Sequence, residues 1–309
     1  MTFNLFLSQA LNGLQFGVLL FLMAAGLTLV FGIMSFVNLA HGSLYMFGAY
    51  FAATLATHTG SFVLALILSV LLVFLLGLVV DWLGLYRLHR RSHLEQVLAT
   101  FGIVLFCNEI VRVFWGAAPV YMETPDSLSS AISLGGFMYP SYRLLIIGAG
   151  LVVAVGLYWL IERTRIGMLI RAGASNRQMV AALGVNINWL NRLIFALGAG
   201  LAALAGALVG PILSIESGMG EPILILTLVV IVIGGIGSIR GAFLGALIVG
   251  VVDTLGRILI PVWLRASFDP GVATAVGPAL ASMLVYILMA VVLALRPQGL
   301  FPVKARGQS

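Results

Sequence analysis

The chain has 309 residues, of which 61% are hydrophobic and only 8% are charged, and its mean hydropathy is +1.15. Water-soluble domains carry about 25% charged residues, so this composition excludes a soluble globular protein. The formal net charge is +6, which raises the question of a nucleic-acid partner; the placement of the basic residues, described below, argues against one.

The apolar residues form blocks of about 20 residues, the length that an α-helix needs to cross a bilayer. The alternating pattern of a transmembrane β-barrel is absent. The N-terminus lacks a basic n-region and a convincing cleavage site, so we interpret it as a retained span. We predict an all-α, polytopic transmembrane bundle over residues 1–309, with eight or nine spans near 9–33, 36–57, 62–85, 94–115, 143–161, 192–214, 222–239, 242–260 and 276–295. The number is left open because glycines and polar residues interrupt the second and seventh spans.

The basic residues indicate the orientation of these spans. With nine spans, most of them fall on one side of the bilayer: Arg87, Arg90, Arg91, Arg163, Arg165, Arg171, Arg177, Arg192, Arg240, Arg296, Lys304 and Arg306. Loops rich in Lys and Arg stay in the cytoplasm, so we expect a cytoplasmic C-terminus and an N-terminus outside. The positive charge then reflects insertion topology and gives no support for a nucleic-acid partner. An outer loop is expected at about 116–142, either as a solvated loop or as a docking face for a soluble partner.

A polar segment, "RAGASNRQMVAALGVN" (Arg171 to Asn186), interrupts the apolar sequence. Ser175 and Gln178 fit the S-x-x-Q capping box, and Gly184 suits a helix end because glycine adopts positive φ at little cost. These signals predict a helix of about two turns over 176–183, with Met179, Ala182 and Leu183 on one face. So short a helix needs a surface to pack on, which is either the protein's own helix ends or another protein.

Three motifs in this order resemble the permeases of the branched-chain (hydrophobic) amino acid uptake family of ABC importers. They are "GLTLVFGIMSFVNLAHGSLYMFGAY" (Gly26 to Tyr50), "RTRIGMLIRAGASNRQMVAALGVN" (Arg163 to Asn186) and "IGGIGSIRGAFLGALIVG" (Ile233 to Gly250), followed by the tail "RPQGLFP" (Arg296 to Pro302). The resemblance extends over nearly the whole chain. It implies a permease domain with broken helices and a short cytoplasmic coupling helix in a loop at about 162–191.

The resemblance also implies a role for that loop, which would dock into a cytoplasmic ATP-binding subunit. The residues that we expect to take part are Gly167, Arg171, Ala172, Ser175, Asn176, Gln178, Met179, Ala182, Leu183 and Gly184. In the wider importer motif a glutamate followed by two alanines begins the short helix. Here Gln178, Met179 and Val180 stand at those positions while Gly184 is retained, so no particular salt bridge is carried over.

The implied assembly contains further subunits and uses ATP. A second related permease chain and an extracytoplasmic solute-binding protein are expected, in the inner membrane of a bacterium. The chain has no G-x-x-x-x-G-K-[ST] motif, so ATP would be used by the partner subunits and no cofactor is expected on this chain. We predict no catalytic residues and no metal site, because Cys107 is the only cysteine and no second histidine lies near His41.

The first motif places Asn38, His41, Gly42 and Ser43 among apolar residues. Polar side chains at membrane depth commonly face a bundle interior or a water-filled path, and discontinuous helices often bind substrate. This segment is therefore our candidate for the translocation path, with Asn38 and His41 on one helix face. The alternative is that these side chains bond backbone groups freed by a helix break at Gly32.

The third motif contains Gly234, Gly235, Gly237 and Gly241, which superficially suggest a phosphate-binding loop. A nucleotide loop follows a strand, whereas this one joins two predicted membrane helices. Close helix packing and a tight turn explain the glycines better.

Two other functions were weighed. An autonomous ion-driven amino acid transporter would need a titratable group such as Asp253 or Glu109, yet their spacing to Arg257 and Arg112 favours ion pairs within a helix. An intramembrane enzyme lacks support, since Ser43 and His41 point to different helix faces. The sequence leaves the solute open among branched-chain amino acids, other amino acids, amides and urea, and leaves open whether the two permease chains are identical.

Overall fold

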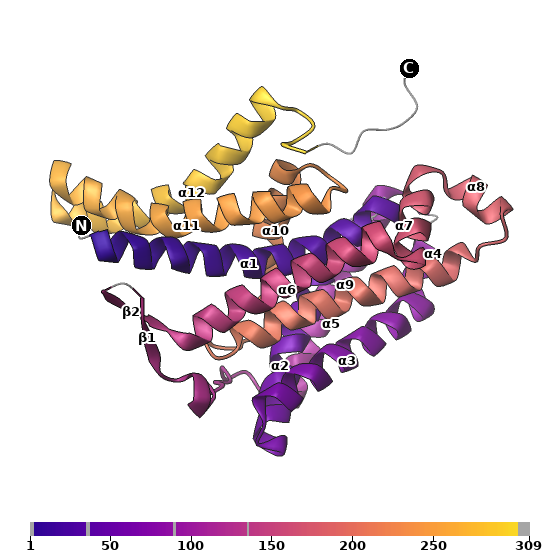
Figure 1. The fold of residues 1–309 in the computed structure, drawn as a ribbon, viewed down its shortest axis with the longest axis horizontal. Coiled ribbons are helices and arrows are strands. Elements are labelled where there is room, and N and C mark those ends of the chain that lie inside the picture. The colour runs from indigo at the N-terminus through magenta and orange to yellow at the C-terminus, as the bar shows by residue number, and fades with distance from the viewer. Residues whose placement is uncertain (1–2, 35–37, 89–90, 135, 302–309) are drawn as a thin grey trace.

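The computed structural model describes residues 3–34, 38–88, 91–134 and 136–301. Helices account for most of these residues (Figure 1). The elements are α1 (Phe3–Met34), α2 (His41–Thr59), α3 (Phe62–Val80) with a π-helical turn (Asp81–Leu85), α4 (Tyr86–Leu88), α5 (His93–Trp115), a 3-10 turn (Asp126–Leu128), β1 (Ala131–Leu134), β2 (Phe137–Pro140), α6 (Ser141–Arg163), α7 (Arg165–Ser175), α8 (Arg177–Ala182), α9 (Ile187–Val209), α10 (Gly220–Gly234), α11 (Ile239–Ser267) and α12 (Pro270–Leu295).

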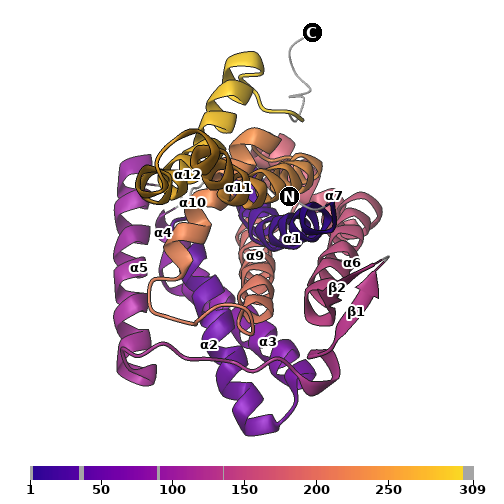
Figure 2. The same cartoon turned by 90° about the vertical axis from the view of Figure 1, so that its left-hand side faces the viewer.

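The bundle is built around α1 and α9, which pack on each other and on α2, α3 and α11. The most apolar stretch of α1 is 83% buried and that of α9 is 72% buried, against 11–22% for α3, α5, α6 and α12. Viewed end-on, α1 and α9 lie inside, with α5 and α6 at opposite edges and α12 outside α11 (Figure 2). Small residues allow this packing, because a Cβ on Gly17 of α1 would lie 2.8 Å from the Ala246 carbonyl oxygen of α11.

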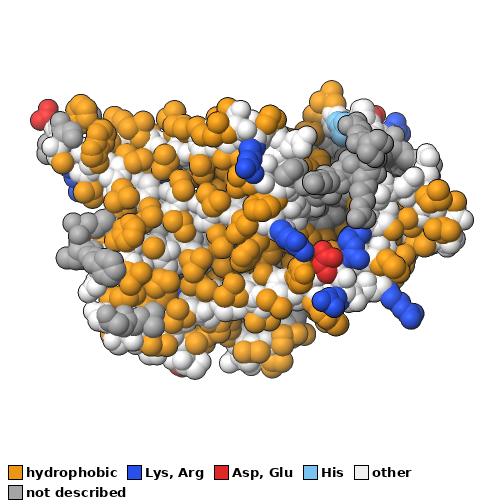
Figure 3. Space-filling view, turned by 45° about the horizontal axis from the view of Figure 1, so that its top comes forward, with side chains coloured by type: hydrophobic (Ala, Val, Ile, Leu, Met, Phe, Trp, Pro, Cys, Tyr) orange, Lys and Arg blue, Asp and Glu red, His pale blue; other side chains and the backbone are white. Residues whose placement is uncertain are grey.

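The protein is a multi-pass membrane protein, as the composition predicts. Seven helices among the described residues are long and apolar enough to span a bilayer: α1, α3, α5, α6, α9, α11 and α12. On the face in Figure 3 hydrophobic side chains dominate, and most of the Lys and Arg side chains lie toward one end. Apolar side chains on the outside of a bundle are expected where lipid replaces water as the solvent.

The predicted second and seventh spans correspond to α2 and α10, and neither is among these seven. The helix α10 has 15 residues, which at 1.5 Å per residue gives about 22 Å, less than the bilayer core of about 30 Å. The count of eight or nine spans therefore stays a prediction. The structure shows that both helices begin inside the bundle beside buried glycines: α2 begins at His41, next to Gly42, and α10 begins at Gly220.

The loop predicted at 116–142 contains a β-hairpin, which the all-helical prediction did not include. Strands β1 and β2 form an antiparallel hairpin in which Ala131 pairs with Pro140 and Leu134 with Phe137. Its turn lies at Gly136, whose φ of +105° favours glycine. The hairpin lies at the end of the bundle opposite α8 (Figure 1).

Candidate functional site

The segment that follows α6 turns back through two short helices. Thr164 caps α7, because its hydroxyl accepts the Gly167 amide hydrogen at 3.1 Å. A Cβ on Gly167 would fall onto the Ile161 carbonyl oxygen, so a side chain at this position would push α7 away from the last turn of α6. Arg171 and Ala172 lie farther along α7, which Ser175 ends.

The short helix α8 begins one residue later than the capping prediction. Asn176, not Ser175, is the N-cap: its side-chain oxygen accepts the Met179 amide hydrogen at 2.9 Å. The capping box of Ser175 and Gln178 is therefore wrong. Ser175 still belongs to α7, and asparagine caps a helix as well as serine does, so the chain breaks at Asn176. The resulting helix has six residues, Arg177–Ala182.

The end of α8 forms at Gly184, as predicted. The φ of Gly184 is +85°, and its amide donates to the Ala181 carbonyl while the Val185 amide donates to Val180. These two bonds make a Schellman motif, which satisfies carbonyls that a helix end otherwise leaves free.

One side of α8 is apolar and has no cover from the described residues. Val180 packs inward with 5% exposure, whereas Met179 and Leu183 are 58% and 76% exposed. Ala182 is exposed on the same side. Exposed apolar side chains that lie together commonly mark an interaction surface. We refer to Met179, Ala182 and Leu183 as the α8 face.

Glu162 connects this segment to the glycine-rich third motif. Its carboxylate lies 3.5 Å from Arg171 of α7 and 3.7 Å from Arg240 at the start of α11. The Arg171 guanidinium also donates to the Ile161 carbonyl, and Arg240 lies over the Tyr158 ring. The last turn of α6 is thus paired with α7 and with the glycine-rich third motif. The sequence did not predict the pair with Arg240, because the two residues lie far apart in the chain.

The segment proposed for the translocation path differs from its prediction in two ways. Helix α1 continues through Gly32 to Met34, so it does not break at Gly32. Helix α2 begins only at His41, so Asn38 precedes it and the two side chains do not share a helix face. The Asn38 side-chain oxygen accepts the Ala40 amide hydrogen at 3.0 Å, so it bonds backbone just before α2 and not backbone freed at Gly32.

His41 is buried inside the bundle with 1% exposure. Its ring lies next to Gly26 of α1, where an added Cβ would come within 3.1 Å of the His41 Cε1 atom. Among the described residues, no group of three or more His, Cys, Asp and Glu could hold a metal ion.

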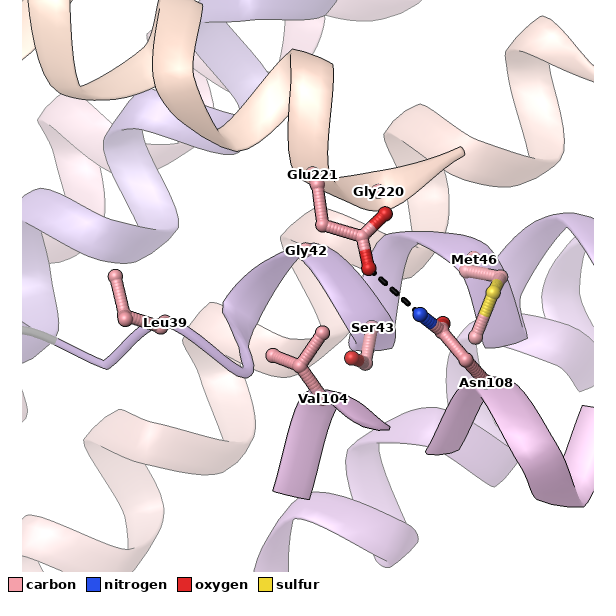
Figure 4. Close-up of a pocket in the computed structure, with 8 residues that line it drawn as sticks. All are labelled: Leu39, Gly42, Ser43, Met46, Val104, Asn108, Gly220 and Glu221. Carbon is pink, nitrogen blue, oxygen red and sulfur yellow. Dashed lines mark hydrogen bonds between the residues drawn. The ribbon is translucent and has the colours of Figure 1, made fainter. Parts of the chain in front are cut away.

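Gly42 and Ser43 line a small pocket where α2 and α10 cross (Figure 4). The sequence interpretation missed its other polar members, Asn108 of α5 and Glu221 of α10. The Asn108 side-chain amide donates to the Glu221 carboxylate at 2.7 Å. Glu221 lies in the first helical turn of α10, which begins at Gly220. A polar asparagine inside an apolar span was the available signal for Asn108.

The glycine-rich turn holds the helices α10 and α11 close together. A Cβ on Gly234 would fall onto the backbone of Gly241, and the reverse is also true. Gly235 and Gly237 take φ values of +104° and +82°. Ser238 caps α11 by accepting the Gly241 amide hydrogen at 3.0 Å.

The tail after α12 folds onto this turn. The Leu300 amide donates to the Ile233 carbonyl at 2.9 Å, and the Phe301 amide donates to Gly234 at 3.0 Å. These carbonyls lie at the end of α10 and have no partner within that helix. The third motif and the tail are thus parts of one structure.

Both predicted ion pairs are present. Glu109 lies 2.8 Å from Arg112, and Asp253 lies 2.9 Å from Arg257. Each carboxylate is therefore paired with a residue of its own helix, as expected for structural pairing.

Comparison with known proteins agrees with this architecture. Residues 9–293 match the family described as the permease component of the branched-chain amino acid transport system. The chain is 31% identical over 264 residues to the high-affinity branched-chain amino acid transport system permease protein BraD of Pseudomonas aeruginosa, covering 81% of this chain and 86% of BraD.

Two further relatives carry similar names. The chain is 28% identical over 274 residues to LivH of Escherichia coli K12, a permease protein of the same description, covering 82% of this chain and 86% of LivH. It is 27% identical over 265 residues to a probable LivH of Methanocaldococcus jannaschii, covering 82% of this chain and 80% of that protein. These matches favour a transport subunit over an autonomous ion-driven carrier. The chain belongs to the family of branched-chain amino acid ABC transporter permeases.

Proposed function

We propose that this chain forms the translocation path of an ATP-driven importer for branched-chain or other small apolar amino acids. It would be a subunit that passes the solute through the membrane and binds no cofactor of its own, while partner subunits hydrolyse ATP. The relatives named above support the solute class. A second related permease chain and an extracytoplasmic solute-binding protein would complete the assembly.

The observation that carries this proposal is the α8 face. A helix of six residues is unstable alone in water, yet α8 is capped at both ends and anchored by Val180. Its other side exposes Met179 and Leu183, and the neighbouring helix α7 carries Arg165 and Arg171. We infer that a cytoplasmic ATP-binding subunit covers the α8 face. The docking residues would be those of α7 and α8 that the family resemblance assigned.

If the α8 face docks on a cytoplasmic subunit, the orientation of the chain in the membrane follows. With α8 on the cytoplasmic side of a bacterial inner membrane, the β1–β2 hairpin and the N-terminus would lie outside, and the C-terminal tail inside. The basic residues at the α8 end, including Arg165, Arg171 and Arg240, support this orientation because such residues are retained in the cytoplasm.

The experiment is affinity purification of the tagged chain from native membranes, with co-purifying proteins identified by mass spectrometry. Leu183→Asp should abolish recovery of the ATP-binding subunit, because it places a charge in the α8 face. The matched control is Ala181→Asp, which adds the same charge to the same helix at an exposed position outside the α8 face.

An ATP-binding subunit recovered with the native and control chains but lost with Leu183→Asp supports the docking role. Equal recovery with Leu183→Asp overturns that role. A native chain that purifies alone under conditions that preserve transport would instead favour the ion-driven carrier.

A further inference from the structure

A small, partly open pocket lies between α2, α5 and α10, and the empty space among its lining residues is about 170 Å³ when the open solvent at its mouth is included. Two helices begin at this pocket: Gly42 lies in the first turn of α2, and Gly220 is the first residue of α10. Discontinuous helices of this kind form solute sites in transporters, because their free ends present unpaired backbone groups inside the membrane.

The pocket has an acidic side. The Glu221 carboxylate accepts a hydrogen bond from Asn108 at 2.7 Å, and Figure 4 shows both side chains directed toward the same space. None of the ion pairs formed among the described residues includes Glu221. A carboxylate without a basic partner favours a bound cation.

The opposite side of the pocket is suited to an anion. The first turn of α2 has no side-chain cap, and the positive end of its dipole favours negative charge there, although the His41 and Ser43 amides already donate to the Asn38 and Ala40 carbonyls. The Ser43 hydroxyl lines the pocket beside this turn and Ser43 is only 4% exposed. Apart from the weak thiol of Cys107, this hydroxyl has no hydrogen-bonding partner among the described residues. A buried hydroxyl without a strong partner is costly, and a ligand oxygen would satisfy it.

The rest of the lining is apolar. Leu39, Met46 and Val104 complete the pocket, and Figure 4 shows them around the polar side chains. An acidic side, an anion-binding side and an apolar wall together match the three parts of an apolar amino acid.

We propose that this pocket binds the zwitterionic amino acid during its passage. The ammonium group would bind the Glu221 carboxylate and the side-chain oxygen of Asn108. The carboxylate group would bind the Ser43 hydroxyl beside the positive end of the α2 dipole, and the apolar side chain would lie against Leu39, Met46 and Val104. This proposal rests on the proposed function, since it identifies a site for the same class of solute.

The test uses the chain purified together with its native partner subunits, in the absence of the soluble binding protein. Three probes separate the charges: leucine, isocaproate, which lacks the ammonium group, and isopentylamine, which lacks the carboxylate. Affinity is obtained from the rise of the unfolding temperature with probe concentration. The native complex should bind leucine more tightly than either analogue.

Two variants should then fail in opposite ways. Glu221→Gln keeps an oxygen for the Asn108 bond but removes the charge, so leucine and isopentylamine should bind about tenfold more weakly while isocaproate is unaffected. Ser43→Ala should weaken leucine and isocaproate and leave isopentylamine unchanged. The control is Glu216→Gln, which removes an exposed carboxylate that does not line the pocket and should change nothing.

If the Asn108–Glu221 bond were purely structural, Glu221→Gln would weaken the binding of all three probes equally or of none. Either result overturns the pocket assignment. Uptake of labelled leucine by the native complex, with ATP and with the solute-binding protein added, tests the proposed function separately. If uptake occurs while the two variants discriminate as the native chain does, the pocket fails alone. If the native complex takes up no leucine, the solute class itself fails.

Discussion

Gly42 of α2 and Gly220 of α10 lie with their backbones in direct contact: a Cβ on Gly42 would be 2.6 Å from the Gly220 carbonyl oxygen. This contact places the starts of two helices together, although 178 positions separate them (from the residue numbers, 220 − 42). Both glycines also line the pocket between α2, α5 and α10.

Replacement of Gly220 by alanine should therefore destabilise the protein. The new methyl group would fall onto the Gly42 backbone, and overpacking of this kind costs about 1–3 kcal/mol. The measurement is the unfolding temperature of the purified complex in detergent. Gly156→Ala of α6 is the control, because nothing lies within 4 Å of an added Cβ there; equal unfolding temperatures for the two variants would contradict the close contact.

Gly184 is expected to matter through its backbone conformation. At a φ of +85°, alanine should cost about 1–2 kcal/mol locally and loosen the end of α8. We expect lower uptake by Gly184→Ala at unchanged membrane content. Asparagine tolerates positive φ, so Gly184→Asn should retain more uptake than Gly184→Ala. The reverse order would exclude backbone strain as the reason for glycine.

A side chain at Gly299 should release the segment after α12 from the end of α10. This residue has a φ of +80°, and a Cβ on it would lie 2.6 Å from the Gly235 Cα atom. In Gly299→Val, hydrogen exchange at the Leu300 and Phe301 amides should accelerate, because both lose their carbonyl partners. Gly60→Val introduces similar strain at a φ of +65° with nothing within 4 Å, and it should leave these two amides protected. Unchanged exchange in Gly299→Val would mean that the tail docks without this contact.

The Glu162 pairs should contribute little to stability. The side chains of Arg171, Arg240 and Glu162 are 44%, 68% and 39% exposed, so solvent screens both pairs. We expect Glu162→Gln to lower the free energy of unfolding by no more than about 1 kcal/mol. Chemical unfolding in detergent measures this difference, and a loss of several kcal/mol would show that the pairs are more buried than described.

The proposed orientation can be tested with single cysteines. Cys107 is the only native cysteine, so Cys107→Ser provides a background for His58→Cys, in the last turn of α2, and Ala181→Cys of α8. In cells whose outer membrane is permeable and whose inner membrane is intact, a membrane-impermeant thiol reagent should label the cysteine at position 58 directly. The cysteine at position 181 should react only after the membrane is opened. The opposite pattern would invert the topology.

The sequence by itself determined the features that depend on neighbouring residues. The apolar runs predict most spans to within a few residues, since crossing a bilayer requires a fixed length of apolar helix. The helix end at Gly184 is also predictable from the local sequence, because the residue that ends a helix often takes a positive φ and glycine does so without strain. The i, i+3 and i, i+4 spacings likewise predicted the Glu109–Arg112 and Asp253–Arg257 pairs.

Only the tertiary structure decided the contacts between distant segments. Whether Ser175 or Asn176 caps α8 depends on how far α7 continues, and both residues suit the role. The partners of Asn108, Glu221 and the tail lie far away in sequence, and no local pattern specifies them. Glycine-to-glycine approaches between helices bring these groups together, because removing the side chains lets the backbones of α2 and α10 touch and leaves a polar pocket beside the contact.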